Sequence, residues 1–327
     1  MFRKILVPLD GSSTGEQAVP IAAAIAKLVS AAVRLAHVYR PHLPEEICTG
    51  VPCDMDRWKQ MRSYLAQQAA KLRALGVPTE TALLNGPVVD TLAQHAATVK
   101  ADLVVMTTHG AGPLRRVNLG STADALVRRL DIPTLLVRSA TAGTAATIAH
   151  PRHLLVPLDG SPEAEAALAT AVVFAQALGG ARFTLLWVVN PTALCDVAPS
   201  GTAIPFRYED VHDRLRQSAD MYLDRVAKPY LDRGLDVRTQ VHDHPDPAAG
   251  ILEAVHDLGC DLVVMGTHSR SGFARLLRGS TTRAVVGQAD GPVLLQPTAH
   301  SSCPKGPHAH PRSPAHGRPD APRGDGA

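Results

Sequence analysis

The sequence lacks the features that mark three common classes of protein. Its five cysteines are odd in number and show no regular spacing, which excludes a disulfide framework. No apolar run approaches the roughly 20 residues that a transmembrane helix requires. The net charge is +3, with acidic and basic residues well mixed, unlike a nucleic-acid-binding surface. We therefore expect a protein that binds neither membranes nor nucleic acid.

The amino terminus shows no targeting segment. Met1 is followed at once by a strand-like stretch, without the long apolar region and small-residue cleavage site of a signal peptide. We therefore expect a cytoplasmic protein whose cysteines remain reduced.

Several familiar ligand motifs are also missing. There is no Gly-x4-Gly-Lys-(Ser/Thr), so the chain lacks the phosphate-binding lysine of P-loop NTPases. Cys48 and Cys53, with His42 nearby, have no second ligand pair at a compatible spacing, which favours loop cysteines without a metal. We expect His242 and His244, at the end of a predicted strand, to point to opposite faces. Shared metal ligation by these two histidines is therefore not expected.

What the sequence does contain is a long internal repeat. Residues 4–12 return as residues 153–161, and the stretch that begins at Asp102 returns at Asp261. With 327 residues, 45% of them hydrophobic, the chain is long enough for two domains with full cores. Copies of this length indicate tandem domains and not a solenoid. We predict domain 1 at residues 1–138, a linker at 139–151, domain 2 at 152–296 and a disordered Pro- and His-rich tail at 297–327.

Each copy alternates apolar strands with helices. In copy one we predict strands at residues 5–9, 33–39, 77–84, 103–106 and 134–137. The predicted helices cover residues 13–29, 56–75, 87–99 and 121–130. Ser13 and Glu16 have the spacing of a capping box, and Ser161-Pro162 predicts the start of the first helix in copy two. Copy two is expected to repeat the order of copy one.

This order predicts an α/β fold, with two tandem, doubly wound, parallel five-stranded sheets of the Rossmann-like kind. Strands that are apolar on both faces require helices on both sides of the sheet. In such a sheet a ligand binds outside the carboxyl ends of the strands, where the strand order reverses. If strand one lies beside strand four, the loops after these two strands share one crevice. These loops are also the stretches most alike between the copies.

The loop after the fourth strand contains the strongest motif, and it occurs twice. Copy one has Thr107-x2-Gly110-x9-Gly120-Ser121-Thr122, and copy two has Gly266-x2-Ser269-x9-Gly279-Ser280-Thr281. Small residues let backbone N–H groups approach an anion, and the helix N-terminus adds partial positive charge. The pattern predicts a phosphate cradle in each copy. Without a ligand, the apolar run would simply be a buried strand and Gly-Ser-Thr a plain helix N-cap. This interpretation does not explain why the loops after both the first and the fourth strands are so similar in the two copies.

These residues resemble the universal stress protein family in its tandem two-domain form. The ATP-binding branch of that family has Gly-x2-Gly-x9-Gly-(Ser/Thr) after strand four and an aspartate at the end of strand one. The resemblance implies an adenine nucleotide alpha hydrolase-like fold, with ATP as the ligand and Mg²⁺ as a candidate companion. Each copy departs at one glycine, since Thr107 and Ser269 replace glycines of the motif. Thr and Ser are small, so we expect the cradles to be weakened at most, unless the backbone there needs φ > 0.

The resemblance and the chemistry together assign roles within each crevice. An aspartate beside phosphates would be repelled, so we expect Asp10 and Asp159 to bind ribose hydroxyls or Mg²⁺. The residues expected at the phosphates are Thr107, His109, Gly110, Gly120, Ser121 and Thr122 in copy one, and Gly266, His268, Ser269, Gly279, Ser280 and Thr281 in copy two. The residues expected around adenine are Pro8, Leu9, Val38 and Met106 in copy one, and Pro157, Leu158, Val188 and Met265 in copy two.

The leading hypothesis is a cytoplasmic, ATP-binding regulatory protein of the stress-response type, with an unidentified client protein. Neither cradle has a nucleophile–base pair, so we expect no catalysis beyond slow ATP hydrolysis or autophosphorylation. The alternative is a nucleotide-free interaction module, which the lost glycines favour. A nucleotide-using transferase or hydrolase ranks last, because no His-x-Gly-His follows strand one. By analogy with the family, the copies are expected to form an internal pseudo-dimer through their fifth strands, with further homodimerisation optional.

Overall fold

The structure is a computed structural model of the whole chain. It describes residues 2–39, 55–108, 119–138, 151–177, 180–191, 208–267 and 280–297. The predicted linker and tail lie almost entirely outside these residues, as do Cys48 and Cys53.

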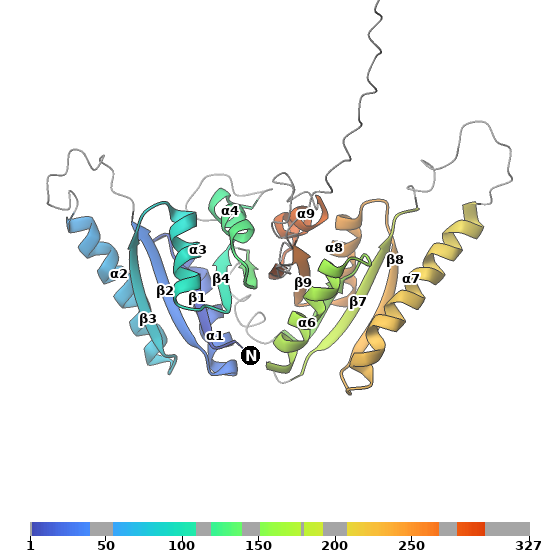
Figure 1. Cartoon of the computed structure of the whole chain (residues 1–327), viewed down its shortest axis with the longest axis horizontal. Helices are drawn as coiled ribbons and strands as arrows, with labels where there is room; N and C mark the ends of the chain where they lie inside the picture. Colours follow the sequence, from blue (N-terminus) through green and yellow to red (C-terminus); the bar gives the residue numbers. More distant parts are fainter. Residues whose placement is uncertain are drawn as a thin grey trace, which may run out of the picture.

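The described strands form one continuous sheet (Figure 1). They are β1 (Lys4–Pro8), β2 (Ala32–Tyr39), β3 (Thr79–Asn85), β4 (Leu103–Thr107), β5 (Thr134–Val137), β6 (His153–Pro157), β7 (Arg182–Val189), β8 (Val237–Asp243), β9 (Leu262–Thr267) and β10 (Val293–Pro297). Their order is β3-β2-β1-β4-β5-β10-β9-β6-β7-β8. The predicted α/β class, with parallel strands within each copy, is confirmed. The sheets of the two copies meet edge to edge and so share one ten-stranded sheet.

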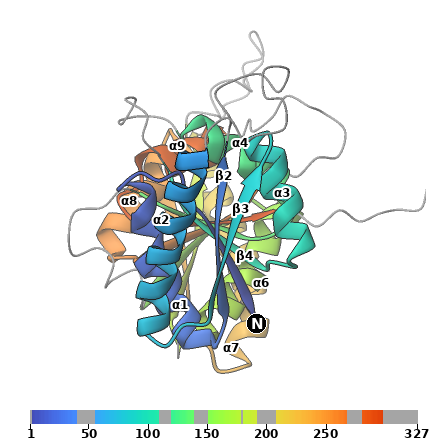
Figure 2. The ribbon, with the colours of Figure 1, turned by 90° about the vertical axis from the view of Figure 1, so that its left-hand side faces the viewer.

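Helices cover both faces of this sheet. They are η1 (Gly15–Gln17), α1 (Ala18–Val29), α2 (Met55–Ala74), α3 (Val88–Thr98), α4 (Ser121–Arg129), α6 (Pro162–Ala177), α7 (Tyr208–Leu231), α8 (Pro247–Leu258) and α9 (Ser280–Gln288). One buried cluster lies under α1, α2, α6 and α7, and the other lies under α3, α4, α8 and α9. Figure 2 shows α1 and α2 on one side of the copy-one strands and α3 on the other.

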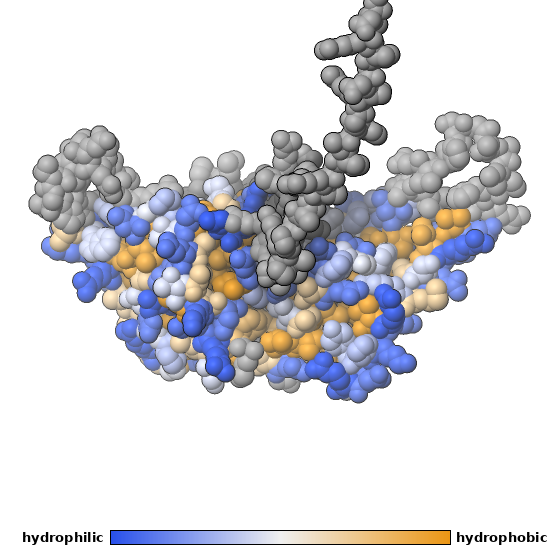
Figure 3. Space-filling view, in the orientation of Figure 1, coloured by the Kyte–Doolittle hydropathy of each residue, from blue (hydrophilic) through white to orange (hydrophobic). Residues whose placement is uncertain are grey.

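The surface mixes hydrophilic residues with smaller hydrophobic areas (Figure 3). Among the described residues, exposed large apolar side chains occur mainly on the two long helices, namely Met55 on α2 and Leu215, Met221 and Leu231 on α7. Within the same residues, no helix combines the length and the hydropathy that crossing a bilayer would require.

The contact between the copies lies at the centre of the sheet. β5 pairs with β10 in antiparallel register, so the two fifth strands meet as predicted. On one face Phe2 of copy one packs edge-on against Phe174 of α6, with 5.6 Å between ring centroids. Arg138, just after β5, donates from its guanidinium to the carbonyl of Ala289 at 3.2 Å. Backbone pairing, aromatic packing and a side-chain hydrogen bond therefore all join the copies.

The first helix starts differently in the two copies. In copy two, Ser161 acts as predicted: its Oγ accepts a hydrogen bond of 3.2 Å from the third residue of α6. In copy one, the predicted capping box of Ser13 and Glu16 is wrong. A 3₁₀ turn precedes α1, and the cap of α1 has no side-chain hydrogen bond. Ser12, the repeat equivalent of Ser161, makes the corresponding contact by accepting from Gly15 N–H at 3.0 Å.

A partly buried histidine, His153, is expected to make the stability of copy two depend on pH. The Nε2 of His153, on β6, lies 2.8 Å from Thr184 Oγ1, and its Nδ1 lies 3.2 Å from the carbonyl of Leu258. Burial lowers the pKa of His153 below its ordinary value, although the Leu258 contact opposes this shift. The folded chain therefore takes up this proton less readily than the unfolded chain. The contribution of neutral His153 to the stability of the folded chain is present above about pH 6.5. It is lost as the pH falls towards the pKa of His153 in the folded state.

We predict that the chain loses stability between about pH 7.5 and about pH 5.5, and that His153→Gln loses less over the same interval. Glutamine keeps donor and acceptor groups at this position but cannot gain a proton. Urea unfolding of both proteins at the two pH values measures the difference. Equal losses in the two proteins would contradict the role of His153.

Candidate functional site

In each copy the first and fourth strands end side by side, at the place where the sequence predicts a crevice. β1 pairs with β4, and β6 pairs with β9, so the predicted neighbours are confirmed. In both copies the second strand lies on the other side of the first strand, so the strand order reverses at this point. The carboxyl ends of both strands therefore lie side by side at one edge of the sheet, which is where open parallel sheets bind ligands.

The apolar residues predicted around adenine lie on both faces of the sheet, since Leu9 and Leu158 belong to the cluster under α1, α2, α6 and α7 and the others named below belong to the cluster under α3, α4, α8 and α9. Val38 and Met106 are buried in the same cluster, at 9% and 6% exposed. In copy two, Met265 belongs to that cluster and the partly buried Val188 packs against it. Both crevices therefore have an apolar wall of matching composition.

The backbone of the first loop is already hydrogen-bonded to the neighbouring strand. The N–H groups of Leu9 and Leu158 each donate to a carbonyl of the second strand at 2.8 Å. In copy one, His37 Nδ1 also lies 2.8 Å from the Leu9 carbonyl. His37 was not identified from the sequence. In copy two the equivalent position of the second strand is occupied by Trp187. The loops that follow the first strand therefore have different neighbours in the two copies.

The two aspartates organise the turns in which they lie. Asp10 Oδ1 accepts hydrogen bonds from the backbone N–H and the Oγ of Ser12, at 2.9 and 2.6 Å. Asp159 Oδ1 accepts the same pair from Ser161, at 3.0 and 2.5 Å. The residue between has a left-handed backbone, with φ of +83° at Gly11 and +81° at Gly160. One oxygen of each aspartate thus shapes the turn, a role signalled by the repeated Asp-Gly-Ser.

The first motif position of copy two is a glycine for a packing reason. A Cβ on Gly266 would lie 2.1 Å from the carbonyl oxygen of Glu163, in the first turn of α6. Thr107 occupies the equivalent position in copy one, where a 3₁₀ turn replaces the first turn of the helix. Gly266 therefore lets β9 approach α6, a packing role that the motif did not indicate.

The helix that follows the fourth strand begins at the crevice in both copies. α4 starts at Ser121 with Gly120 as its N-cap, and Gly120 N–H donates to Thr108 O at 2.8 Å. Ser121 and Thr122 are exposed, and within the described residues no side chain caps this helix. In copy two α9 begins at Ser280, followed by the partly buried Thr281. The other predicted phosphate residues, His109, Gly110, His268, Ser269 and Gly279, lie outside the described residues.

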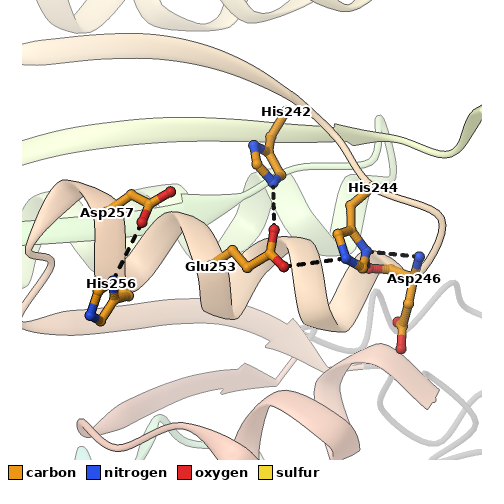
Figure 4. Close-up of polar contacts among 6 residues, drawn as sticks. All are labelled: His242, His244, Asp246, Glu253, His256 and Asp257. Carbon is orange, nitrogen blue, oxygen red and sulfur yellow. Dashed lines mark hydrogen bonds and ion pairs between the residues drawn. The ribbon is translucent and has the colours of Figure 1, made fainter.

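His242 and His244 do not point to opposite faces, which corrects the expectation from the sequence. Their rings lie nearly parallel, with centroids 6.4 Å apart, and both face Glu253 of α8 (Figure 4). The distances from their Nε2 atoms to the Glu253 carboxylate oxygens are 3.2 and 3.4 Å. Alternate residues of a strand share a face, so the error lay in the periodicity used. In the part of the chain that the structure describes, no group of three or more His, Cys, Asp or Glu side chains is arranged to hold a metal ion.

Both copies of the repeat match a known family. Residues 1–138 and 151–297 each match the sequence pattern of the Universal stress protein family. The chain therefore belongs to the universal stress protein family, in its tandem form.

Sequence relatives agree with this assignment, and a solved structure shares the fold. A universal stress protein of Mycolicibacterium smegmatis is 28% identical over 306 residues, which covers 89% of this chain and 96% of that protein. A universal stress protein of Thermus aquaticus is 36% identical over 140 residues, which is 42% of this chain and all of that protein. A crystal structure of a universal stress protein from Archaeoglobus fulgidus shares the fold, with a TM-score of 0.65, 17% identity and coverage of 89% of this chain and 97% of that one.

Proposed function

We propose that the protein is a cytoplasmic, ATP-binding regulatory protein of the stress response, with one nucleotide cradle in each copy. The observation that supports this most is the duplicated crevice. In both copies an aspartate turn follows the first strand, apolar residues flank the switch point, and a helix that begins with small polar residues follows the fourth strand. Two copies that differ elsewhere have kept this combination.

The chemistry of the residues fits an adenine nucleotide. Val38 and Met106 offer an apolar surface to a base. Ser121 and Thr122 are exposed at a helix N-terminus, where backbone N–H groups and partial positive charge favour phosphate oxygens. Asp10, in the turn after β1, would bind ribose hydroxyls or a Mg²⁺ that accompanies the phosphates. Bound Mg²⁺ would supply positive charge that offsets repulsion between the carboxylate and the phosphates.

Calorimetric titration of the full chain with ATP and Mg²⁺ tests the proposal. We expect saturable binding below about millimolar nucleotide. Two partial ligands are titrated separately. Adenosine tests binding of the base by the apolar residues, and inorganic triphosphate tests binding of phosphates at the helix N-terminus. Failure to bind ATP at about millimolar concentration would reject the proposed function.

One observation favours a different function, a nucleotide-free module that binds a client protein. Gly266 is explained by its contact with Glu163, so its presence does not itself require a ligand. The same calorimetric titration distinguishes the two functions, because only the first requires ATP binding. Under this second function, the partners are a client protein and, optionally, a second copy of the chain.

A further inference from the structure

The turn that contains Asp159 rests on the side chain of Trp187. A Cβ placed on Gly160 would lie 3.4 Å from Cη2 and 3.7 Å from Cζ3 of that indole. Gly160 has φ of +81°, so the turn combines a left-handed backbone with close aromatic contact. Trp187 lies on β7 and is only partly buried. The indole thus forms a floor for the turn.

Tyr222 of α7 holds this indole in place. The two rings pack edge to face, with centroids 5.1 Å apart and an interplanar angle of 68°. The Tyr222 hydroxyl donates to Glu165 Oε1 at 2.9 Å, and the guanidinium of Arg225 lies 5.3 Å above the ring. Contacts in three directions therefore limit the movement of the Tyr222 ring.

These contacts close a ring that returns to the aspartate. Glu165 lies in the first turn of α6, and its N–H donates to the carbonyl of Ser161 at 3.2 Å. Ser161 in turn donates to Asp159 Oδ1. The turn is therefore supported from both sides. A path of contacts runs from Asp159 through Ser161, Glu165, Tyr222 and Trp187 to Gly160.

Copy one supports its turn differently. His37 takes the place of Trp187 and contacts the Leu9 carbonyl. Gly11 has a flexible thioether as its neighbour, since its added Cβ would lie 3.8 Å from Met61 Sδ. The aromatic floor is therefore a property of the second crevice, and copy one provides an internal comparison.

We propose that Trp187 and Tyr222 are positioning residues for Asp159, holding its turn in the geometry with which the second crevice binds nucleotide. The nucleotide part of this inference rests on the proposed function. The positioning part concerns the protein alone and can be measured without a ligand.

Hydrogen exchange of the ligand-free full chain tests the positioning. In Trp187→Leu we expect the amides of residues 159–164, other than Pro162, to exchange at least about tenfold faster, while those of residues 10–15 stay unchanged. Trp58→Leu is the matched control, because Trp58 packs against Tyr39 in copy one. Tyr222→Phe, which removes only one hydroxyl, should give a smaller increase and covers the case in which Trp187→Leu fails to fold. Unchanged exchange at residues 159–164 in both variants would overturn the proposal.

Nucleotide binding gives the second measurement. In an Asp10→Asn background, Trp187→Leu should weaken ATP binding by about tenfold or more. In Trp58→Phe, where Trp187 is the remaining tryptophan of two, ATP should change the emission saturably. Unchanged affinity would overturn the link to the ligand. If the Asp10→Asn chain binds no ATP, the proposed function fails for the second crevice, whereas the exchange experiment still decides the positioning.

Discussion

Replacing Gly266 with alanine is expected to destabilise the protein by about 3 kcal/mol, at the upper end of overpacking effects. The new Cβ would lie 2.1 Å from the carbonyl oxygen of Glu163, and this atom belongs to the backbone of a helix. Relief requires α6 to move away from β9, and α6 also packs against β10 at the joint between the copies. Urea unfolding of the wild type and the variant measures the change.

Gly291→Ala is the matched control for this substitution. It makes the same change in the same copy, but the added Cβ would be 3.5 Å from the nearest atom, Asp261 O, which is an ordinary contact. We expect its stability to stay within about 0.5 kcal/mol of the wild type. A similar result for Gly266→Ala would show that the close approach to α6 does not require glycine.

The second large effect is expected when Asp10 and Asp159 are both replaced by asparagine. Asparagine keeps an oxygen that can accept the hydrogen bonds of Ser12 and Ser161, so the turns should persist. The negative charges available to ribose hydroxyls or Mg²⁺ are lost. We expect ATP binding to weaken by about a hundredfold, about 2.7 kcal/mol, with little change in stability. Calorimetry and urea unfolding of the same samples separate the two effects.

Asp102 and Asp261 provide a control with the same change of charge. Their carboxylates accept backbone hydrogen bonds from Arg3 and Arg152 at the opposite end of the sheet. The double substitution to asparagine there should leave ATP binding unchanged. If both pairs lower the affinity equally, the effect of Asp10 and Asp159 arises from overall charge or stability and not from contact with nucleotide.

Most strands could be predicted because each is a short apolar run between polar turns. The predicted strand at residues 134–137 coincides with β5 (Thr134–Val137), and that at 103–106 is one residue shorter than β4 (Leu103–Thr107). Duplication strengthened these predictions, since each run occurs twice. The position of the crevices followed from the same information together with the general rule for open parallel sheets.

The errors concern contacts that depend on three-dimensional packing. Ser13 and Glu16 have the spacing of a capping box, but it is Ser12 Oγ that accepts a hydrogen bond from the backbone N–H of Gly15, in the 3₁₀ turn before α1. The packing role of Gly266 depends on the carbonyl oxygen of Glu163 in α6, a residue that is distant from Gly266 in the sequence. Trp187 packs against Tyr222, but no local sequence pattern predicts its position under an aspartate turn.

The antiparallel pairing of β5 with β10 has a further consequence for the assembly. Both central edges belong to one polypeptide, so each edge meets its partner at a high effective concentration that dilution cannot lower. The stoichiometry of the paired units is therefore fixed at one to one, whatever the amount of protein present. Because each half has its own sequence, a substitution can alter one crevice and leave its counterpart intact. A symmetric assembly of identical subunits does not allow that independence.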